Sequence, residues 1–69
     1  NKKKEKDGKM YYAFYADSYQ GPIQLRGLEN RNYQVMDYEN KLDLGRIKGP
    51  TVKINVNFTH HLLVEAIPQ

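Results

Sequence analysis

The 69-residue sequence contains no cysteine, only two histidines and no glycine-rich phosphate loop. Without cysteine, neither a disulfide framework nor a cysteine-based zinc site can form. The sequence also lacks a run of the roughly 20 apolar residues that a membrane helix needs, so no membrane partner is predicted. Because a chain this short buries only about 60% of its unfolded surface, we expect one domain with one thin core.

Positive charge is concentrated at the start of the sequence. The net charge is +3, and residues 1–9 carry all of it, because five lysines there outnumber Glu5 and Asp7 while the later charges balance. A nucleic-acid-binding protein needs its basic patch on the folded body, so no nucleic-acid partner is predicted. Residues 1–9 are predicted to be a disordered lysine-rich linker or a segment introduced for expression. Residues 10–69 are predicted to be the folded domain.

From Gly21 to Ala66, apolar and polar residues alternate in short segments that turn residues separate. This period of two is typical of half-buried strands, whose successive side chains point to opposite faces. Six short strands are predicted, over 10–16, 22–28, 33–38, 42–47, 51–58 and 61–67. The spacing of the turns predicts an all-β fold, a small antiparallel β-sandwich of about six short strands, with a small Greek-key barrel as the other architecture that fits.

Residues 51–58 show the clearest alternation. Val52, Ile54, Val56 and Phe58 share one face of this strand, and the residues between them are polar. We expect these four side chains to face the core. Their expected packing partners are Ile23, Leu25, Val35, Leu62 and Val64.

Glycine, proline and aspartate mark the predicted breaks between strands. Residues 17–21 are predicted to be a loop, Gly49-Pro50 a break in the chain and Gly45 a β-bulge. Asp37 and Asp43 are expected to organise turns through hydrogen bonds from backbone amides to their carboxylates.

No catalytic, cofactor-binding or metal site is assigned from the sequence. His60 and His61 are adjacent, so on a strand their rings point in opposite directions and cannot both reach one metal ion. A glycosidase needs two carboxyl groups held about 5 to 9 Å apart across a cleft. The carboxylates considered for that role are scattered along the chain: Asp37, Glu39, Asp43 and Glu65.

The candidate contact residues are four tyrosines near the start of the folded region: Tyr11, Tyr12, Tyr15 and Tyr19. Exposed aromatic rings can stack on sugar rings, so these residues could form a carbohydrate-binding platform. In the other interpretation, they pack in the core and against the rest of a parent protein. The second interpretation is favoured, because residues 10–16 are apolar on both faces, as in a strand that is buried on both sides.

Four segments carry a resemblance to a known family: GPIQLRGL at 21–28, YQVMDY at 33–38, Leu44-Gly45, and FTHHLLVEA at 58–66. Taken in this order, they resemble the C-terminal β-domain of clan D glycoside hydrolases, particularly bacterial α-galactosidases of the melibiase type. The resemblance implies a catalytic (β/α)-barrel that contains the catalytic aspartates and is followed by an antiparallel β-sandwich. No catalytic residue is therefore transferred to this chain.

The sequence is accordingly interpreted as an excised, non-catalytic C-terminal β-sandwich that packs against and stabilises the catalytic barrel of a glycoside hydrolase. Because it begins at Asn1 and opens with a polar run, the chain is expected to lack a signal peptide and to be a segment of a longer protein. Alone, it is expected neither to hydrolyse α-galactosides nor to bind them appreciably. The alternatives are a free-standing carbohydrate-binding module that uses exposed tyrosines, and a structural interaction module of an unrelated enzyme.

Overall fold

The computed structural model describes residues 4–6 and 8–69, which form five strands. The strands are β1 (Lys4–Lys6), β2 (Lys9–Leu25), β3 (Asn32–Asp37), β4 (Leu42–Lys48) and β5 (Val52–Pro68). They make one antiparallel sheet in the order β1-β2-β5-β3-β4. None of these residues lies in a helix of the length and hydrophobicity that crossing a membrane requires. The predicted all-β antiparallel class is confirmed.

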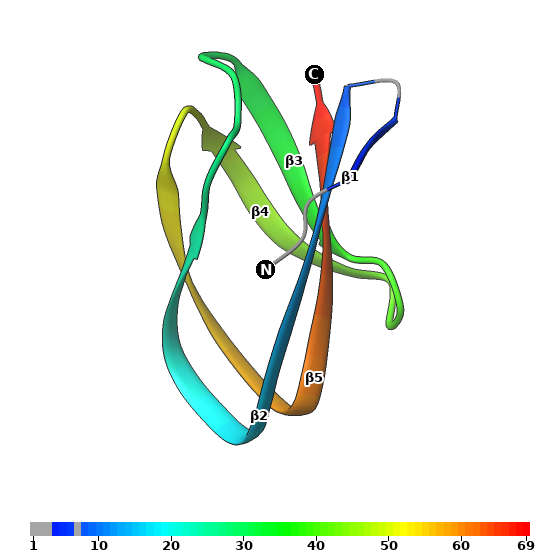
Figure 1. The fold of residues 1–69 in the computed structure, drawn as a ribbon, viewed down its shortest axis with the longest axis vertical. Coiled ribbons are helices and arrows are strands. Elements are labelled where there is room, and N and C mark those ends of the chain that lie inside the picture. The colour runs from blue at the N-terminus through cyan, green and yellow to red at the C-terminus, as the bar shows by residue number, and fades with distance from the viewer. Residues whose placement is uncertain (1–3, 7) are drawn as a thin grey trace.

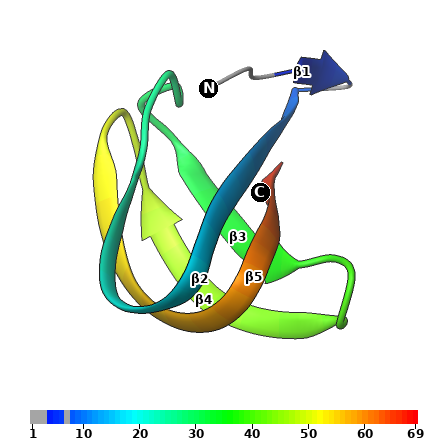
Figure 2. The same ribbon diagram turned by 60° about the horizontal axis from the view of Figure 1, so that its bottom comes forward.

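The two 17-residue strands, β2 and β5, pair along their length and bend together (Figure 1). At the bend Ala16 pairs with His60 but Ser18 pairs with Thr59, which leaves Asp17 as the extra residue of a β-bulge. His60 has φ 72°, in the left-handed region. Bulges bend a strand and increase its twist, and Figure 2 shows both strands curving around the interior. One sheet thereby forms the two layers of a small sandwich.

This bend occurs where the sequence indicated separate strands. Strand β2 contains the predicted strands 10–16 and 22–28, apart from the last three residues of 22–28. Strand β5 contains the predicted strands 51–58 and 61–67, apart from Thr51. The loop predicted over 17–21 is wrong. These residues stay in β2, because its pairing with β5 resumes immediately after the bulge.

The bulge also keeps both halves of β2 facing the core. Met10 and Tyr12, at even positions, are buried before the bulge, whereas Ile23 and Leu25, at odd positions, are buried after it. A shift of one residue moves every side chain to the other face of a strand. The single extra residue therefore allows one continuous strand to bury both apolar sets.

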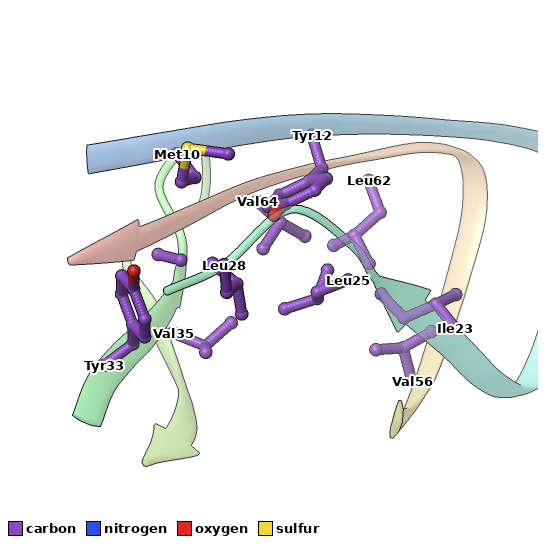
Figure 3. Packing of buried hydrophobic residues seen from close by; sticks show 11 residues of the cluster. Met10, Tyr12, Ile23, Leu25, Leu28, Tyr33, Val35, Val56, Leu62 and Val64 are labelled. Carbon is purple, nitrogen blue, oxygen red and sulfur yellow. The ribbon is translucent and has the colours of Figure 1, made fainter. Parts of the chain in front are cut away.

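The core lies between the two layers (Figure 3). It consists of eleven buried hydrophobic residues: Met10, Tyr12, Ile23, Leu25, Leu28, Tyr33, Val35, Val56, Leu62, Val64 and Ala66. All five packing partners expected from the sequence are among them. Of the predicted inward face of 51–58, Val56 is buried, whereas Val52, Ile54 and Phe58 pack against the core but remain partly exposed.

Two buried tyrosines hold the segment that connects β2 to β3. The Tyr12 hydroxyl donates a hydrogen bond to the Arg26 carbonyl oxygen (2.5 Å), and the Tyr33 hydroxyl accepts one from the Glu29 amide (2.9 Å). Leu28, between these two points, is buried in the core. Burial raises the pKa of Tyr12 to about 12, and electrostatic interaction with Tyr33 adds to the shift. The connection is thus part of the packed structure.

Two aspartates organise the β3–β4 hairpin, as predicted. Asp37 is buried and accepts hydrogen bonds from the backbone amide and the side-chain amide of Asn40, both at 3.0 Å. Asp43 accepts one from the Gly45 amide (2.8 Å). Gly45 has φ 110° and lies beside a register shift between β3 and β4, so the predicted bulge is confirmed. Glycine adopts such a conformation without strain.

Four residues of the linker predicted over 1–9 lie in strands: Lys4–Lys6 in β1 and Lys9 at the start of β2. Lys4–Lys6 form β1, which pairs with Lys9–Tyr11 through a turn at Gly8 (φ 79°). The prediction of disorder rested on the polar composition of this segment. Strands pair through backbone hydrogen bonds and need no apolar side chain, so composition alone could not reveal β1. Residues 1–3 and 7, which belong to the same predicted linker, lie outside the described residues.

Candidate binding and docking surfaces

The four tyrosines chosen from the sequence lie in different environments. Tyr12 is only 3% exposed and points into the core, so it is removed from the candidate surface residues. Tyr15 is 76% exposed. Tyr11 contacts the ring of Tyr38, whereas Tyr19 packs against Phe58 next to the core. The structure therefore does not bring the four rings together into one platform.

One face of the sheet carries aromatic rings on the side opposite the core. We call it the outer aromatic face and define it by Tyr11, Tyr15, Tyr38 and Leu63. The rings of Tyr11 and Tyr38 meet edge to face, with centroids 5.7 Å apart and planes at 89°. Tyr15 and Tyr38 are 76% and 42% exposed. Leu63 on β5 pairs with Ala13, between Tyr11 and Tyr15 on β2. Apolar ring surface is thus available to a partner.

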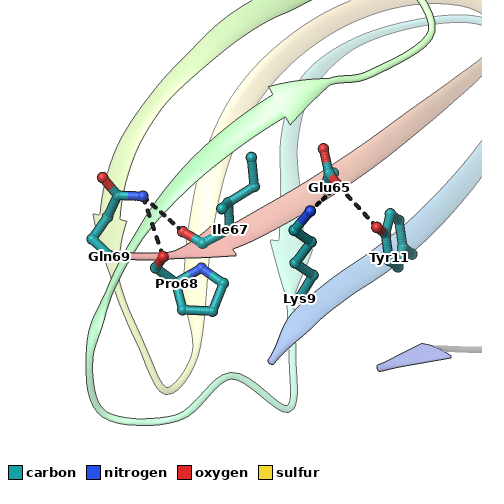
Figure 4. A network of polar contacts seen from close by, with 6 residues as sticks. All are labelled: Lys9, Tyr11, Glu65, Ile67, Pro68 and Gln69. Carbon is teal, nitrogen blue, oxygen red and sulfur yellow. Dashed lines mark hydrogen bonds and ion pairs between the residues drawn. The ribbon is translucent and has the colours of Figure 1, made fainter. Parts of the chain in front are cut away.

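A polar network supports this face (Figure 4). Glu65 accepts a hydrogen bond from the Tyr11 hydroxyl (2.9 Å), and its carboxylate lies 3.9 Å from the Lys9 ammonium. The side chain of Glu65 is only 16% exposed, so its interaction with Tyr11 is well shielded from water. The carboxylate fixes one edge of the Tyr11 ring, which orders the outer aromatic face before any partner binds.

All four carboxylates considered for catalysis have structural partners. Asp37 and Asp43 hold the β3–β4 hairpin, and Glu65 binds Tyr11. Glu39 lies 2.8 Å from the Nε2 atom of His61, which links the hairpin turn to β5. The described residues contain no group of three or more acidic or histidine side chains that could hold a metal ion. The other histidine, His60, is exposed at the bend.

A second aromatic feature lies on the concave side of the bend. It is an open hollow of about 290 Å³, which we call the aromatic groove; it is lined by Phe14, Tyr15, Ala16, Tyr19, Pro22, Ile23 and Phe58. The rings of Tyr19 and Phe58 are 5.8 Å apart and tilted by 39°. Another open hollow, of about 410 Å³, is lined by Asn32, Arg46, Ile47, Lys48 and Gln69. Among the side chains that the structure describes, no carboxylate lines either hollow and no aromatic ring lines the second.

Sequence reasoning missed three residues of these surfaces. Tyr38 was assigned to a strand face, but it begins the hairpin turn and is exposed there. Its position directly before the Glu39–Asn40–Lys41 turn was the available signal. Phe58 was expected to face the core, and Phe14 was only part of the predicted strand 10–16. No local pattern could have placed them in a groove, because the groove exists only once β2 and β5 bend together.

Comparison with known proteins relates the chain to a sugar-cleaving enzyme. No family model matches it. Over 71 aligned residues it is 41% identical to a Flavonifractor plautii protein named A type blood alpha-D-galactosamine galactosaminidase. The alignment covers 91% of this chain but only 7% of that protein. The chain therefore resembles a small region of a protein whose name denotes a glycoside hydrolase, in agreement with the broader part of the resemblance noted in the sequence.

Proposed function

We propose that this chain is the non-catalytic β-domain of a glycoside hydrolase, and that it packs against and stabilises the catalytic (β/α)-barrel of its parent. The parent would be an enzyme of the α-galactosidase type, of clan D and similar to melibiases. The relative supports this assignment, because its name denotes an enzyme that acts on an α-linked galactosamine and this chain matches only 7% of its length. A region that small leaves room for a separate catalytic domain in such a protein.

The observation that carries the docking part of the proposal is the outer aromatic face. Tyr15 and Tyr38 expose large aromatic surfaces although the domain has a complete core on its other side. Contiguous exposed apolar surface in a small domain commonly marks an interaction site. Aromatic residues are enriched in the centres of interfaces, and Tyr11 is already held in place by Glu65.

Catalysis by this chain alone does not fit its geometry. Glycoside hydrolysis needs two carboxyl groups facing each other across a substrate site. Here the candidate carboxylates are bonded to Asn40, Gly45, His61 and Tyr11. We therefore assign hydrolysis to the remainder of the parent, and the isolated chain should not cleave chromogenic α-galactosides or α-galactosaminides.

The docking proposal is tested in the parent protein with the double variant Tyr15→Ser, Tyr38→Ser. We expect the thermal midpoint of the parent to fall, because two aromatic interface contacts are lost, while the isolated 69-residue chain keeps its own midpoint. The matched control is Lys53→Ser, Asn55→Ser, which changes two exposed residues of β5 away from the outer aromatic face. An unchanged parent midpoint with the tyrosine variant would contradict the docking role.

The second candidate function, a carbohydrate-binding module, is favoured by the 76% exposure of Tyr15. In that case the outer aromatic face would stack on sugar rings. A sugar titration of the isolated chain separates the two functions. Saturable binding centred on Tyr11 and Tyr38 supports the module, whereas a response of the parent's stability to Tyr15→Ser, Tyr38→Ser supports docking.

A further inference from the structure

In contrast to the expectation from the sequence that the isolated chain does not bind α-galactosides appreciably, we propose that the aromatic groove binds a single pyranose ring of a saccharide, weakly. The groove lies on the concave side of the bend and shares Tyr15 with the outer aromatic face. Its other rings, Phe14, Tyr19 and Phe58, do not belong to that face, so the test below is read from these three. The choice of a sugar as ligand rests on the proposed function, which places the domain in a sugar-cleaving enzyme. Three features of the groove favour such a ligand: its aromatic rings, the neighbouring backbone edge and its size.

The aromatic rings of the groove are held in place before a ligand arrives. The Tyr19 hydroxyl donates a hydrogen bond to the Pro22 carbonyl oxygen (2.5 Å), and the Tyr19 ring packs on Phe58. A β-carbon built on Gly21 would lie 3.4 Å from the Tyr19 hydroxyl oxygen, so the ring lies across a residue that has no side chain. Fixing a binding group in its bound position lowers the entropic cost of association.

Strand β2 can supply polar groups next to these rings. Six of the seven lining residues belong to β2. Among the described strands, β2 pairs only with β5 from Tyr12 onward, so no strand pairs with its other edge there. Backbone N–H and C=O groups on such an edge can bond to a ligand. A pyranose has an apolar face of C–H groups and a rim of hydroxyls. Such a ring can stack on an aromatic surface while its hydroxyls bond to a neighbouring backbone edge.

A free edge beside an apolar groove can also accept an added peptide strand, but this edge is poorly suited to that. The bulge at Asp17 interrupts the regular ladder, and bulges are a common protection of sheet edges. Pro22 has no N–H to donate to an added strand. A compact ligand needs only one or two such bonds, whereas a peptide needs an uninterrupted row, so the edge favours the compact ligand.

The size of the groove limits the ligand to about one ring. Its volume of about 290 Å³ lies at the lower end of the roughly 300–1,000 Å³ of small-molecule sites. An open groove of this size buries only part of a ligand. We therefore expect a dissociation constant of about 1 mM for a monosaccharide, with the binding energy drawn mainly from stacking on Tyr19 and Phe58.

The test is an NMR titration of the isotope-labelled 69-residue chain with methyl α-galactoside, galactosamine and N-acetylgalactosamine, with sorbitol as a non-cyclic polyol control. We expect saturable shifts centred on Tyr19, Phe58 and Phe14 with at least one sugar and none with sorbitol. Phe58→Leu keeps an apolar side chain but removes a ring, and should weaken binding about tenfold. Tyr38→Leu, the matched change on the outer aromatic face, should leave binding unchanged.

Three outcomes would overturn the proposal. The first is the absence of saturable shifts with every sugar in a chain whose spectrum shows that it is folded. The second is a set of shifts centred on Tyr11 and Tyr38, which do not line the groove and would place the sugar on the outer aromatic face. The third is equal binding by Phe58→Leu and the unmodified chain. None of these bears on docking, because docking is measured by the stability of the parent.

Discussion

Two pairs of tyrosines in this small domain have opposite roles. The inner pair, Tyr12 and Tyr33, is almost completely buried and binds the backbone of the connection between β2 and β3. The outer pair, Tyr15 and Tyr38, is exposed on the opposite side of the sheet. Tyr12 and Tyr15 lie on the same strand, so residue type does not separate them. Tyr12 and Tyr15 differ instead in the direction of the side chain and in whether the hydroxyl has a backbone partner.

The inner pair should dominate stability, and Tyr33→Ala is expected to have the largest effect. Loss of this fully buried ring creates a cavity and leaves the Glu29 amide without its acceptor. Truncation of a large buried aromatic residue typically costs about 3–5 kcal/mol, which is a large part of the stability of a small domain. Urea unfolding followed by circular dichroism measures the loss. A change below about 1 kcal/mol would show that the connection is not held by this residue.

The inner pair should also make stability depend on alkaline pH. Tyr12 has a folded-state pKa of about 12 against an unfolded value of 10.0, so both states are protonated below pH 10 and its contribution is fully present there. Between about pH 10 and 12 the unfolded chain loses the proton first. The free energy of unfolding therefore falls as pH rises, by about 2–3 kcal/mol in total.

Tyr12→Phe is the matched variant for this prediction, since it keeps the ring and removes the titrating group. Its free energy of unfolding should fall less steeply than that of the unmodified chain between pH 10 and pH 12. Urea titrations at pH 9, 11 and 12 measure both slopes. If the free energy of unfolding fell equally steeply with pH in both proteins, the loss of stability at alkaline pH would have to come from groups other than Tyr12.

Ile54→Ala tests a position that is neither fully buried, like Tyr33, nor largely exposed, like Tyr15. The sequence predicts that Ile54 is a core residue, and full burial would make the truncation cost about 2–5 kcal/mol. Ile54 is packed against the core but partly exposed, so we expect a smaller loss of about 1–2 kcal/mol. Leu25→Ala, at a fully buried position, is the control and should cost more. Equal losses in a thermal melt would mean that Ile54 is packed as tightly as Leu25.

The outer pair should contribute least to stability. Tyr15→Ala removes a ring that is 76% exposed, and surface substitutions of this kind usually change stability by no more than about 0.5 kcal/mol. The thermal midpoint of the isolated chain should therefore stay near that of the unmodified protein. A loss comparable with that of Tyr33→Ala would remove the contrast between the pairs and with it the argument that Tyr15 is available to a partner.

Much of the fold could be predicted from local patterns, whereas the surfaces could not. Alternation over 51–58 indicated both the strand and its inward face, and Asp37, Asp43 and Gly45 indicated the turns that the structure shows. The loop predicted over 17–21 failed because a bulge and a loop present the same local signal, a change in the parity of the apolar positions. Pairing with a distant strand decides between them.

The candidate surfaces depended on contacts that are remote in sequence. Tyr12 and Tyr15 belong to opposite faces of one apolar strand, and nothing local says which face is covered. The core on one side is supplied by β3, β5 and Leu28, all distant along the chain. The aromatic groove likewise joins Tyr19 to Phe58, which pair across β2 and β5.

The sequence by itself determined that this chain is all-β and which residues are apolar enough to fill one thin core, because side-chain alternation and turn chemistry act over a few neighbouring residues. Only the tertiary structure decided that four predicted strands are two bent ones, that Tyr12 is inside and Tyr15 outside, and that a groove forms at the bend. The physical reason is that burial and the closing of a sheet on itself depend on long-range pairing. The same alternating pattern is compatible with a covered or an uncovered second face until the neighbouring strands are in place.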